Sequence, residues 1–180
     1  MSVRWALFLS GRGSTAQALL DQIGDLDIRF VVTSKQKAGG ILRARRAGLP
    51  ILHFAKDGNW GELHSELVSR GIQAIFLTGF MRLLPADFVT NWQGRIWNVH
   101  PSLLPAYPGA GSMEKSFSDK ARMGVTVHEV THQMDAGPCC LQAEIDNSTD
   151  WESVTTRMAR LEQRLLREWA LRVQRQWRLA

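Results

Sequence analysis

The sequence of 180 residues has only two cysteines, Cys139 and Cys140, and they are neighbours. Two adjacent cysteines can hardly bridge each other or chelate a metal as a pair. Their scarcity excludes a disulfide framework and leaves no cysteine-based metal site. We therefore expect a reduced, cytoplasmic protein that needs no metal.

Long hydrophobic runs are absent as well, since no apolar stretch approaches the roughly 20 residues that would span a bilayer. The first ten residues are mostly apolar, but a glycine-rich loop follows them where a signal peptide would have its cleavage site. We interpret this start as a β-strand and expect no membrane partner. Because no repeat, low-complexity tract or linker interrupts the chain, we expect residues 1–180 to form one domain.

Acidic residues are scarce in one segment near the end of the chain. Residues 157–178 contain seven Arg and two Glu, and this excess of five equals the formal net charge of +5 of the whole chain. The remaining chain is therefore neutral overall. We interpret the arginines as the solvated face of a helix, and we expect no nucleic-acid partner.

The same segment has a continuous apolar stripe, which predicts a long amphipathic helix. Thr149 and Glu152 form a capping-box pattern at its start. The tryptophans near its end fit either core packing, which we favour, or a dimer contact, so a monomer and a homodimer both remain open. The stripe consists of Trp151, Val154, Met158, Leu161, Leu165, Trp169, Val173 and Trp177.

The first half of the chain alternates short apolar runs with amphipathic stretches, a rhythm typical of βαβ units. The run 74–77 has no polar alternation, as expected of a strand covered on both faces of a parallel sheet. The pattern predicts an α/β fold with a doubly wound, mostly parallel sheet, helices on both faces and a Rossmann-type N-terminal half. We expect strands near 3–10, 28–33, 51–54, 73–78, 95–99, 125–130 and 139–145, and helices near 15–23, 40–47 and 60–69.

The loop 10–15 follows the first strand and opens a helix, so its glycines allow an anion to approach free backbone N–H groups. It lacks the Lys-Ser/Thr ending of a P-loop. Gly11, Gly13 and Ala16 satisfy a relaxed dinucleotide fingerprint, but residues 31–34 offer no acidic side chain for a ribose. A monophosphate therefore fits better than a dinucleotide, and a tight turn without a ligand remains the alternative.

Residues 98–105 read Asn-Val-His-Pro-Ser-Leu-Leu-Pro. Asn98 and His100 alternate along an extended segment, so both project to one side at the carboxyl end of a strand, where doubly wound sheets bind substrates. This motif resembles one that is highly specific to the folate-dependent formyltransferase family. Segments 78–84, 124–128 and 134–138 resemble that family too, over nearly the whole chain. The closest pattern is the branch that formylates phosphoribosylglycinamide during purine synthesis.

The resemblance implies that 10-formyltetrahydrofolate donates a formyl group to a small phosphate-bearing amine, with no metal required. It implies that Asn98 and protonated His100 stabilise the oxyanion, while Asp135 accepts the proton of the amine and favours the charge on His100. It assigns further roles to residues that match the family. Gly13, Ser14 and Thr15 would hold the phosphate, Glu162 the ribose or amide end, and Met81, Arg82, Leu84 and His128 the folate.

Several of these residues also fit plainer interpretations. Met81 and Leu84 fit a hydrophobic core, Glu162 a solvated helix position, and His128 a buried structural imidazole. These alternatives remain open from the sequence.

The sequence departs from the phosphoribosylglycinamide branch where substrates bind. A formyltransferase for another amine, a hydrolase that releases formate from 10-formyltetrahydrofolate, and a non-catalytic folate- or phosphate-binding module therefore remain alternatives. Gly111 and Met113 stand where that branch has two histidines, Thr15 where it has Asn, Ala106 where it has Lys, and Trp60 where it has an Arg near the folate tail.

Overall fold

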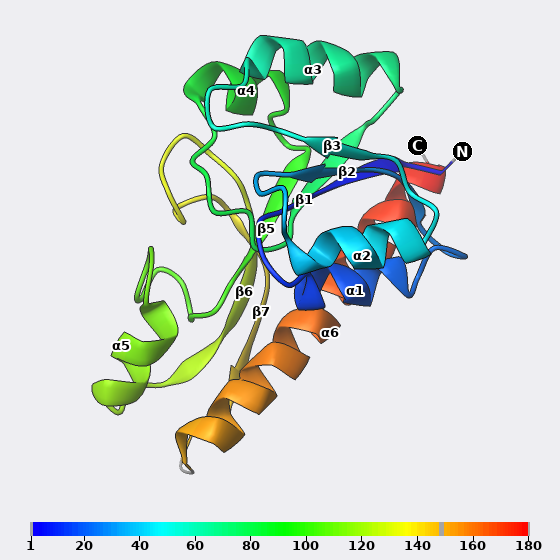
Figure 1. The fold of residues 1–180 in the computed structure, drawn as a ribbon. Helices are drawn as coiled ribbons and strands as arrows, with labels where there is room; N and C mark the ends of the chain where they lie inside the picture. Colours follow the sequence, from blue (N-terminus) through cyan, green and yellow to red (C-terminus); the bar gives the residue numbers. More distant parts are fainter. Residues whose placement is uncertain (1, 148–149, 180) are drawn as a thin grey trace.

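A computed structural model describes residues 2–147 and 150–179. Within these residues, seven strands form one sheet in the order β3-β2-β1-β4-β5-β6-β7 (Figure 1). Strands β1 to β5 pair in parallel, and β6 and β7 are added antiparallel at one edge. The predicted doubly wound, mostly parallel sheet is thus confirmed. The strands are β1 (Arg4–Leu9), β2 (Asp27–Thr33), β3 (Ile51–His53), β4 (Ala74–Leu77), β5 (Ile96–His100), β6 (Met123–Glu129) and β7 (Cys139–Ile145).

Helices flank this sheet on both sides in the described part of the chain. They are α1 (Ser14–Leu20), α2 (Gly39–Arg46), α3 (Trp60–Ser69), α4 (Ala86–Asn91), α5 (Ser112–Ser118) and α6 (Trp151–Leu179). Figure 1 shows α3 and α4 on one side of the sheet and α1, α2 and α6 on the other.

Alternate residues of the central strands supply the two cores, because successive side chains of a strand point to opposite faces. In β1, Trp5, Leu7 and Leu9 join the core shared with α1, α2 and α6. Ala6 and Phe8 join the core shared with α3 and α4. Since both faces are buried, β1 has no polar side of its own, which explains its continuous apolar sequence.

Two short helices, α4 and α5, lie in segments where no helix is predicted. They have six and seven residues. Such short segments contain at most two turns, so they show no clear 3.6-residue repeat in the sequence. Helix α5 still matters for the site, because it begins shortly after the loop that follows His100.

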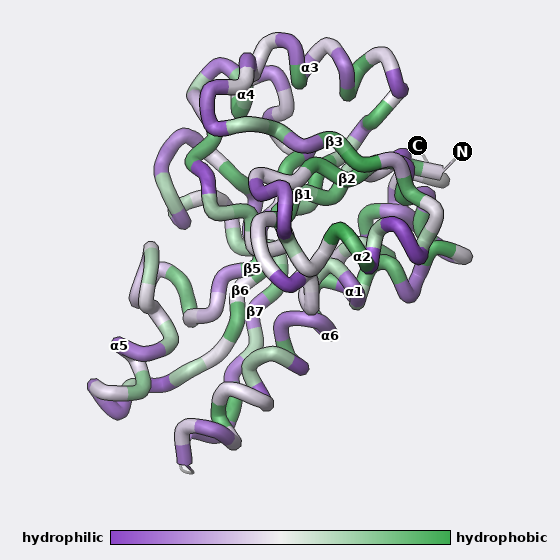
Figure 2. Tube along the Cα trace, in the orientation of Figure 1, coloured by the Kyte–Doolittle hydropathy of each residue, from purple (hydrophilic) through white to green (hydrophobic). Residues whose placement is uncertain are grey.

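The long helix α6 agrees with the predicted amphipathic segment. Val154, Met158, Leu161 and Leu165 are buried in the core that α6 shares with α1 and the sheet. Figure 2 shows hydrophobic and hydrophilic stretches alternating along this helix. No described helix is long and apolar enough to cross a membrane.

The two ends of α6 bear on separate predictions. Trp169 and Trp177 pack against the same core, which supports the core-packing interpretation of these side chains. Thr149, the predicted cap, lies outside the described residues. Asp150 instead accepts a hydrogen bond from the Ser153 N–H at 2.9 Å.

Candidate active site

Neighbouring strands β5 and β6 carry three polar side chains that lie close together near the carboxyl end of β5. Asn98 and His100 lie two residues apart near the end of β5, so they share one side of the strand. His128 of β6 is the direct antiparallel partner of Asn98. Directly paired residues face the same side, and the Nδ2 atom of Asn98 lies 3.3 Å from Nε2 of His128.

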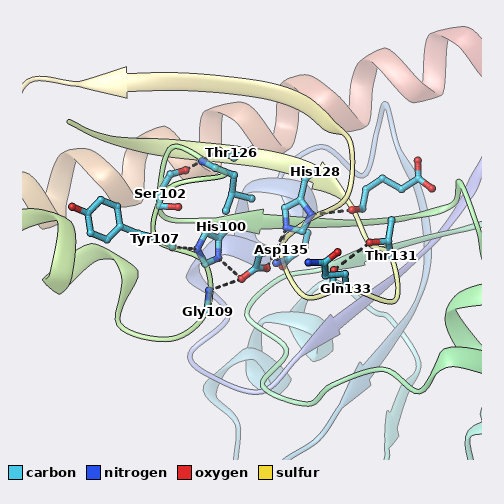
Figure 3. Close-up of polar contacts among 12 residues, drawn as sticks. His100, Ser102, Tyr107, Gly109, Thr126, His128, Thr131, Gln133 and Asp135 are labelled. Atoms are coloured by element: carbon cyan, nitrogen blue, oxygen red, sulfur yellow. Dashed lines mark hydrogen bonds and ion pairs between the residues drawn. The ribbon is translucent and has the colours of Figure 1, made fainter. Parts of the chain in front are cut away.

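Asp135 approaches His100 and His128 from the turn between β6 and β7 (Figure 3). Its Oδ2 atom lies 3.4 Å from Nδ1 of His100, and its Oδ1 atom lies 3.5 Å from Nε2 of His128. The Gly109 N–H donates to Oδ2 at 2.8 Å. The structure therefore brings together Asn98, His100 and Asp135, which the sequence predicts as a catalytic set.

The turn that presents Asp135 has an unusual backbone. Asp135 has a φ of 52°, in the left-handed region that few residues other than glycine adopt. A Cβ atom at Gly137 would lie 1.8 Å from the Glu129 carbonyl oxygen, so only glycine allows the turn to approach β6 this closely. A strained backbone held by close packing is typical of functional sites.

Three side chains of the cluster are nearly sealed from solvent. The side chains of His100, His128 and Asp135 are 8%, 2% and 9% exposed. The pKa of Asp135 lies below its ordinary value of 3.8, first because of hydrogen bonding with His128, then the Gly109 N–H and the charges of both histidines; burial opposes this. Asp135 is therefore ionised at neutral pH, and its interactions are weakly screened.

Both ring nitrogens of His100 face acceptors. Nε2 donates to the Tyr107 carbonyl oxygen at 3.0 Å, while Nδ1 faces Asp135. A neutral imidazole has one N–H, so only the doubly protonated ring supplies a proton to both acceptors. The two acceptors are thus placed where they would stabilise the doubly protonated ring that the expected role of His100 requires.

Tyr107 is anchored at a distance from the chemistry. It has a φ of 53°, and its hydroxyl group donates to Oδ2 of Asp119 at 3.0 Å. This hydrogen bond is the main reason that the pKa of Tyr107 is raised above its ordinary value. Segment 107–109 thus contacts both side chains: the Tyr107 carbonyl accepts from His100, and the Gly109 N–H donates to Asp135.

The predicted phosphate loop lies beside α6. Gly13 has a φ of 72°, and a Cβ atom there would lie 2.6 Å from the Cα atom of Gly40, so glycine is required for the fold itself. The Thr15 hydroxyl donates to Oε2 of Glu162 at 3.4 Å. Gln163 donates to the Ser14 carbonyl oxygen at 3.3 Å.

Glu162 is therefore not a solvated helix charge. Burial raises the pKa of its carboxyl from 4.5 to about 7, and the Thr15 hydrogen bond opposes that rise. The structure brings Glu162 next to the loop although the two are 147 residues apart in the sequence.

The segment after β4 contains the residues predicted to contact folate. Met81 is 76% exposed, which rules out its alternative as a core residue, and Leu83 is exposed to the same extent. Leu84 packs against the core of α3 and α4, in line with its plainer interpretation. The Met81 N–H donates to Oγ of Ser10 at 2.8 Å, which links this segment to the end of β1.

The guanidinium group of Arg82 binds backbone carbonyl oxygens of the loop after β3. Its guanidinium donates to the carbonyl oxygens of Phe54, Ala55 and Lys56 at 3.2, 2.7 and 2.9 Å. The same group lies over the rings of Phe54 and Trp60. Its side chain thus holds a loop in shape, and its backbone is left for any contact with folate.

Three of the departures from the family pattern have a structural account. Gly111 precedes α5 with a φ of 70°, a conformation that suits glycine. Met113 packs against the core beside the sheet. Trp60, in place of an Arg, joins an aromatic cluster with Phe54 and Phe88.

Sequence reasoning missed the residues that support this site. Thr126 of β6 donates to the Ser102 carbonyl oxygen at 2.7 Å and accepts from the Leu104 N–H at 3.1 Å, which pins the loop after His100. Nothing in the sequence marks Thr126 for this role. Tyr107 and Gly109 could have been found, because their Tyr-Pro-Gly segment lies shortly after the Asn-x-His motif.

Comparison with known proteins agrees with this geometry. Residues 3–169 match the formyl transferase family. The chain is 36% identical over 150 residues to the phosphoribosylglycinamide formyltransferase of Escherichia coli strain K12, covering 77% of this chain and 71% of that protein. It is 36% identical over 174 residues to the trifunctional purine biosynthetic protein adenosine-3 of Drosophila melanogaster. That match covers 88% of this chain but spans only 13% of the fly protein.

Solved structures share the whole architecture. The crystal structure of phosphoribosylglycinamide formyltransferase from Anaplasma phagocytophilum matches with a TM-score of 0.91 at 28% identity, covering 98% of this chain and 89% of that one. Glycinamide ribonucleotide transformylase 1 from Geobacillus kaustophilus matches with a TM-score of 0.89 at 30% identity, covering 97% and 100%. Because the family match extends over nearly all residues, including the segments that carry Asn98, His100 and Asp135, the chain belongs to the formyl transferase family.

Proposed function

We propose that this chain transfers the formyl group of 10-formyltetrahydrofolate to the amine of phosphoribosylglycinamide, as a cytoplasmic enzyme of purine biosynthesis. The observation that carries the proposal is the buried cluster of Asn98, His100 and Asp135 at the carboxyl end of β5. The similarity to phosphoribosylglycinamide formyltransferases supports the choice of acceptor.

In the proposed reaction, the amine attacks the formyl carbon and the carbonyl oxygen becomes an oxyanion. Asn98 donates an amide N–H to that oxygen, and the positive charge of His100 stabilises it further. Asp135 accepts the proton of the attacking nitrogen, directly or through water. The bond between the formyl carbon and the donor nitrogen then breaks, and that nitrogen takes up a proton.

The contacts of His100 refine its role. Nε2 of His100 donates to the Tyr107 carbonyl and Nδ1 faces Asp135 at 3.4 Å, so in this arrangement the ring supplies charge and not a free donor. Direct donation to the oxyanion requires the Tyr107 carbonyl to release Nε2. Asn98 is therefore the primary hydrogen-bond donor in the proposed transition state.

The remaining predicted residues fit the two substrates. Gly13, Ser14 and Thr15 would bind the acceptor phosphate through their backbone N–H groups. Glu162, which lies against Thr15, would accept hydrogen bonds from the ribose or amide end. The pteridine would bind near the exposed Met81 and the backbone of Arg82, next to Leu84. His128 is predicted to lie near the folate as well.

A formyltransferase for a different amine is the second candidate. One observation favours it: Gly111 and Met113 stand where the phosphoribosylglycinamide branch has histidines, and Met113 packs into the core. The acceptor contacts of that branch are therefore reduced in this chain.

Turnover assays test the proposal. We expect cleavage of 10-formyltetrahydrofolate that depends on added phosphoribosylglycinamide. His100→Ala and Asn98→Ala should each lower kcat by at least about 100-fold, the usual effect of removing one oxyanion donor. His132→Ala is the matched control, because this histidine lies on the Asp135 turn but is exposed. Amine-independent cleavage would favour the hydrolase, use of another amine the second candidate, and no cleavage the binding module.

A further inference from the structure

His128 makes contacts that a folate-lining or merely structural histidine does not require. Its side chain is 2% exposed, and its ring contacts Asn98 and Glu129. The ring also faces Asp135 (Figure 3). We propose that His128 is a positioning residue, whose neutral ring orients the Asn98 carboxamide toward the formyl oxygen beside Asp135. This inference rests on the formyl transfer proposed above and deepens it.

The tautomer of His128 follows from its first contact. Nδ1 lies 2.9 Å from the Glu129 carbonyl oxygen, so Nδ1 carries the proton and donates. That carbonyl is held in place, because the N–H of its own peptide group, that of Val130, donates to the Ile96 carbonyl oxygen at 2.9 Å. The Glu129 side chain also accepts from the Gly94 N–H at 2.9 Å. In the neutral ring, Nε2 is therefore an acceptor of fixed direction.

This acceptor decides which way the Asn98 amide faces. An NH2 group can donate to Nε2, whereas the amide oxygen of Asn98 would meet its lone pair. The 3.3 Å contact thus assigns Nδ2 of Asn98 to the His128 side. One N–H of Asn98 binds His128, and the second N–H is left for the oxyanion.

Asp135 competes for the same nitrogen. Its Oδ1 atom lies 3.5 Å from Nε2, and a carboxylate binds that atom best when it carries a proton. One nitrogen cannot accept from Asn98 and donate to Asp135 at the same time. The neutral ring therefore orients Asn98, and a ring that has gained a proton binds Asp135.

Replacing His128 with glutamine, asparagine or leucine distinguishes a positioning role from simple packing. A glutamine carboxamide reaches the place of Nε2, where its oxygen accepts from Asn98 and its NH2 group donates to Asp135. An asparagine carboxamide is one methylene shorter and reaches only the place of Nδ1, facing Glu129. Leucine fills space without either contact. The three variants thus differ in the contacts that the proposal invokes.

Steady-state kinetics on the full chain give the first readout. His128→Leu and His128→Asn should lower kcat by about 100-fold, comparable to losing one oxyanion donor. His128→Gln should stay within about fivefold of wild type, and the KM for 10-formyltetrahydrofolate should change by less than about threefold throughout. A raised folate KM with normal kcat would assign His128 to the folate pocket instead. Equal losses in the Gln and Leu variants would make it purely structural.

A second readout needs no turnover. The side-chain NH2 signals of Asn98, identified by their loss in Asn98→Asp, should shift in the NMR spectrum of His128→Leu and stay near wild type in His128→Gln. Unchanged signals in both variants would overturn the positioning role. A wild-type protein that shows this coupling but does not formylate phosphoribosylglycinamide would refute the proposed function alone. Should the Leu variant fail to fold, the Gln and Asn variants carry the comparison.

Discussion

Replacing Glu162 with glutamine should stabilise the protein at pH 8 and have little effect at pH 4.5. Burial beside the phosphate loop raises the pKa of this carboxyl from 4.5 to about 7, and the Thr15 hydroxyl only partly opposes the effect. The charged form is therefore less stable in the folded protein than in the unfolded chain.

The magnitude follows from the two pKa values. The rise from 4.5 to about 7, at roughly 1.4 kcal/mol per pKa unit, corresponds to about 3 kcal/mol. Below the lower pKa, both states are protonated and the effect vanishes. Between the two values the folded protein binds more protons than the unfolded chain, so wild-type stability falls as the pH rises. Above the higher value the full penalty applies.

Urea unfolding followed by circular dichroism between pH 4.5 and pH 8 measures this difference. The free energy of unfolding of Glu162→Gln should exceed that of wild type by an amount that grows across that range to about 3 kcal/mol. Glu168→Gln is the matched control, because this carboxylate lies on the same helix but is 43% exposed and paired with Arg172. A difference between Glu162→Gln and wild type that is the same at both ends of the range would refute the reasoning.

Three further predictions concern the loops and the surface. Gly11→Asp should raise the acceptor KM and spare the folate KM, whereas uncharged Gly11→Asn should not; a Cβ atom there meets no atom within 4 Å, unlike at Gly13. Equal effects of both substitutions would contradict a phosphate site. Tyr107→Phe should lower kcat severalfold by removing the hydroxyl group that anchors segment 107–109, while Asp119→Asn, which keeps an acceptor, should not; unchanged kcat in Tyr107→Phe would show that this anchor is not needed. Binding of duplex DNA or tRNA to the arginines of α6 should vanish near physiological salt in a filter-binding titration, and salt-resistant binding would overturn their assignment as a solvated face.

The sequence by itself determined the features that depend on local order. Continuous apolar runs and amphipathic stretches predicted the doubly wound sheet, because burial on both faces imposes that pattern wherever it occurs. The spacing of Asn98 and His100 placed both on one side of a strand, because strand side chains alternate. The three-to-four-residue stripe predicted α6 for the same kind of reason.

Short or irregular segments escaped this reasoning. Helices α4 and α5 are too short to show a period. The left-handed backbones of Tyr107 and Asp135 are not encoded by residue type, since neither is a glycine. Both conformations persist because contacts from other segments hold them.

Only the tertiary structure decided which side chains meet. The pairing of Asn98 with His128 depends on the antiparallel register of β5 and β6, and a shift by one residue would turn His128 to the other face. The contact of Thr15 with Glu162 joins segments 147 residues apart. Local sequence patterns do not predict such contacts, because strand register and packing depend on the summed burial of both cores and not on any single motif.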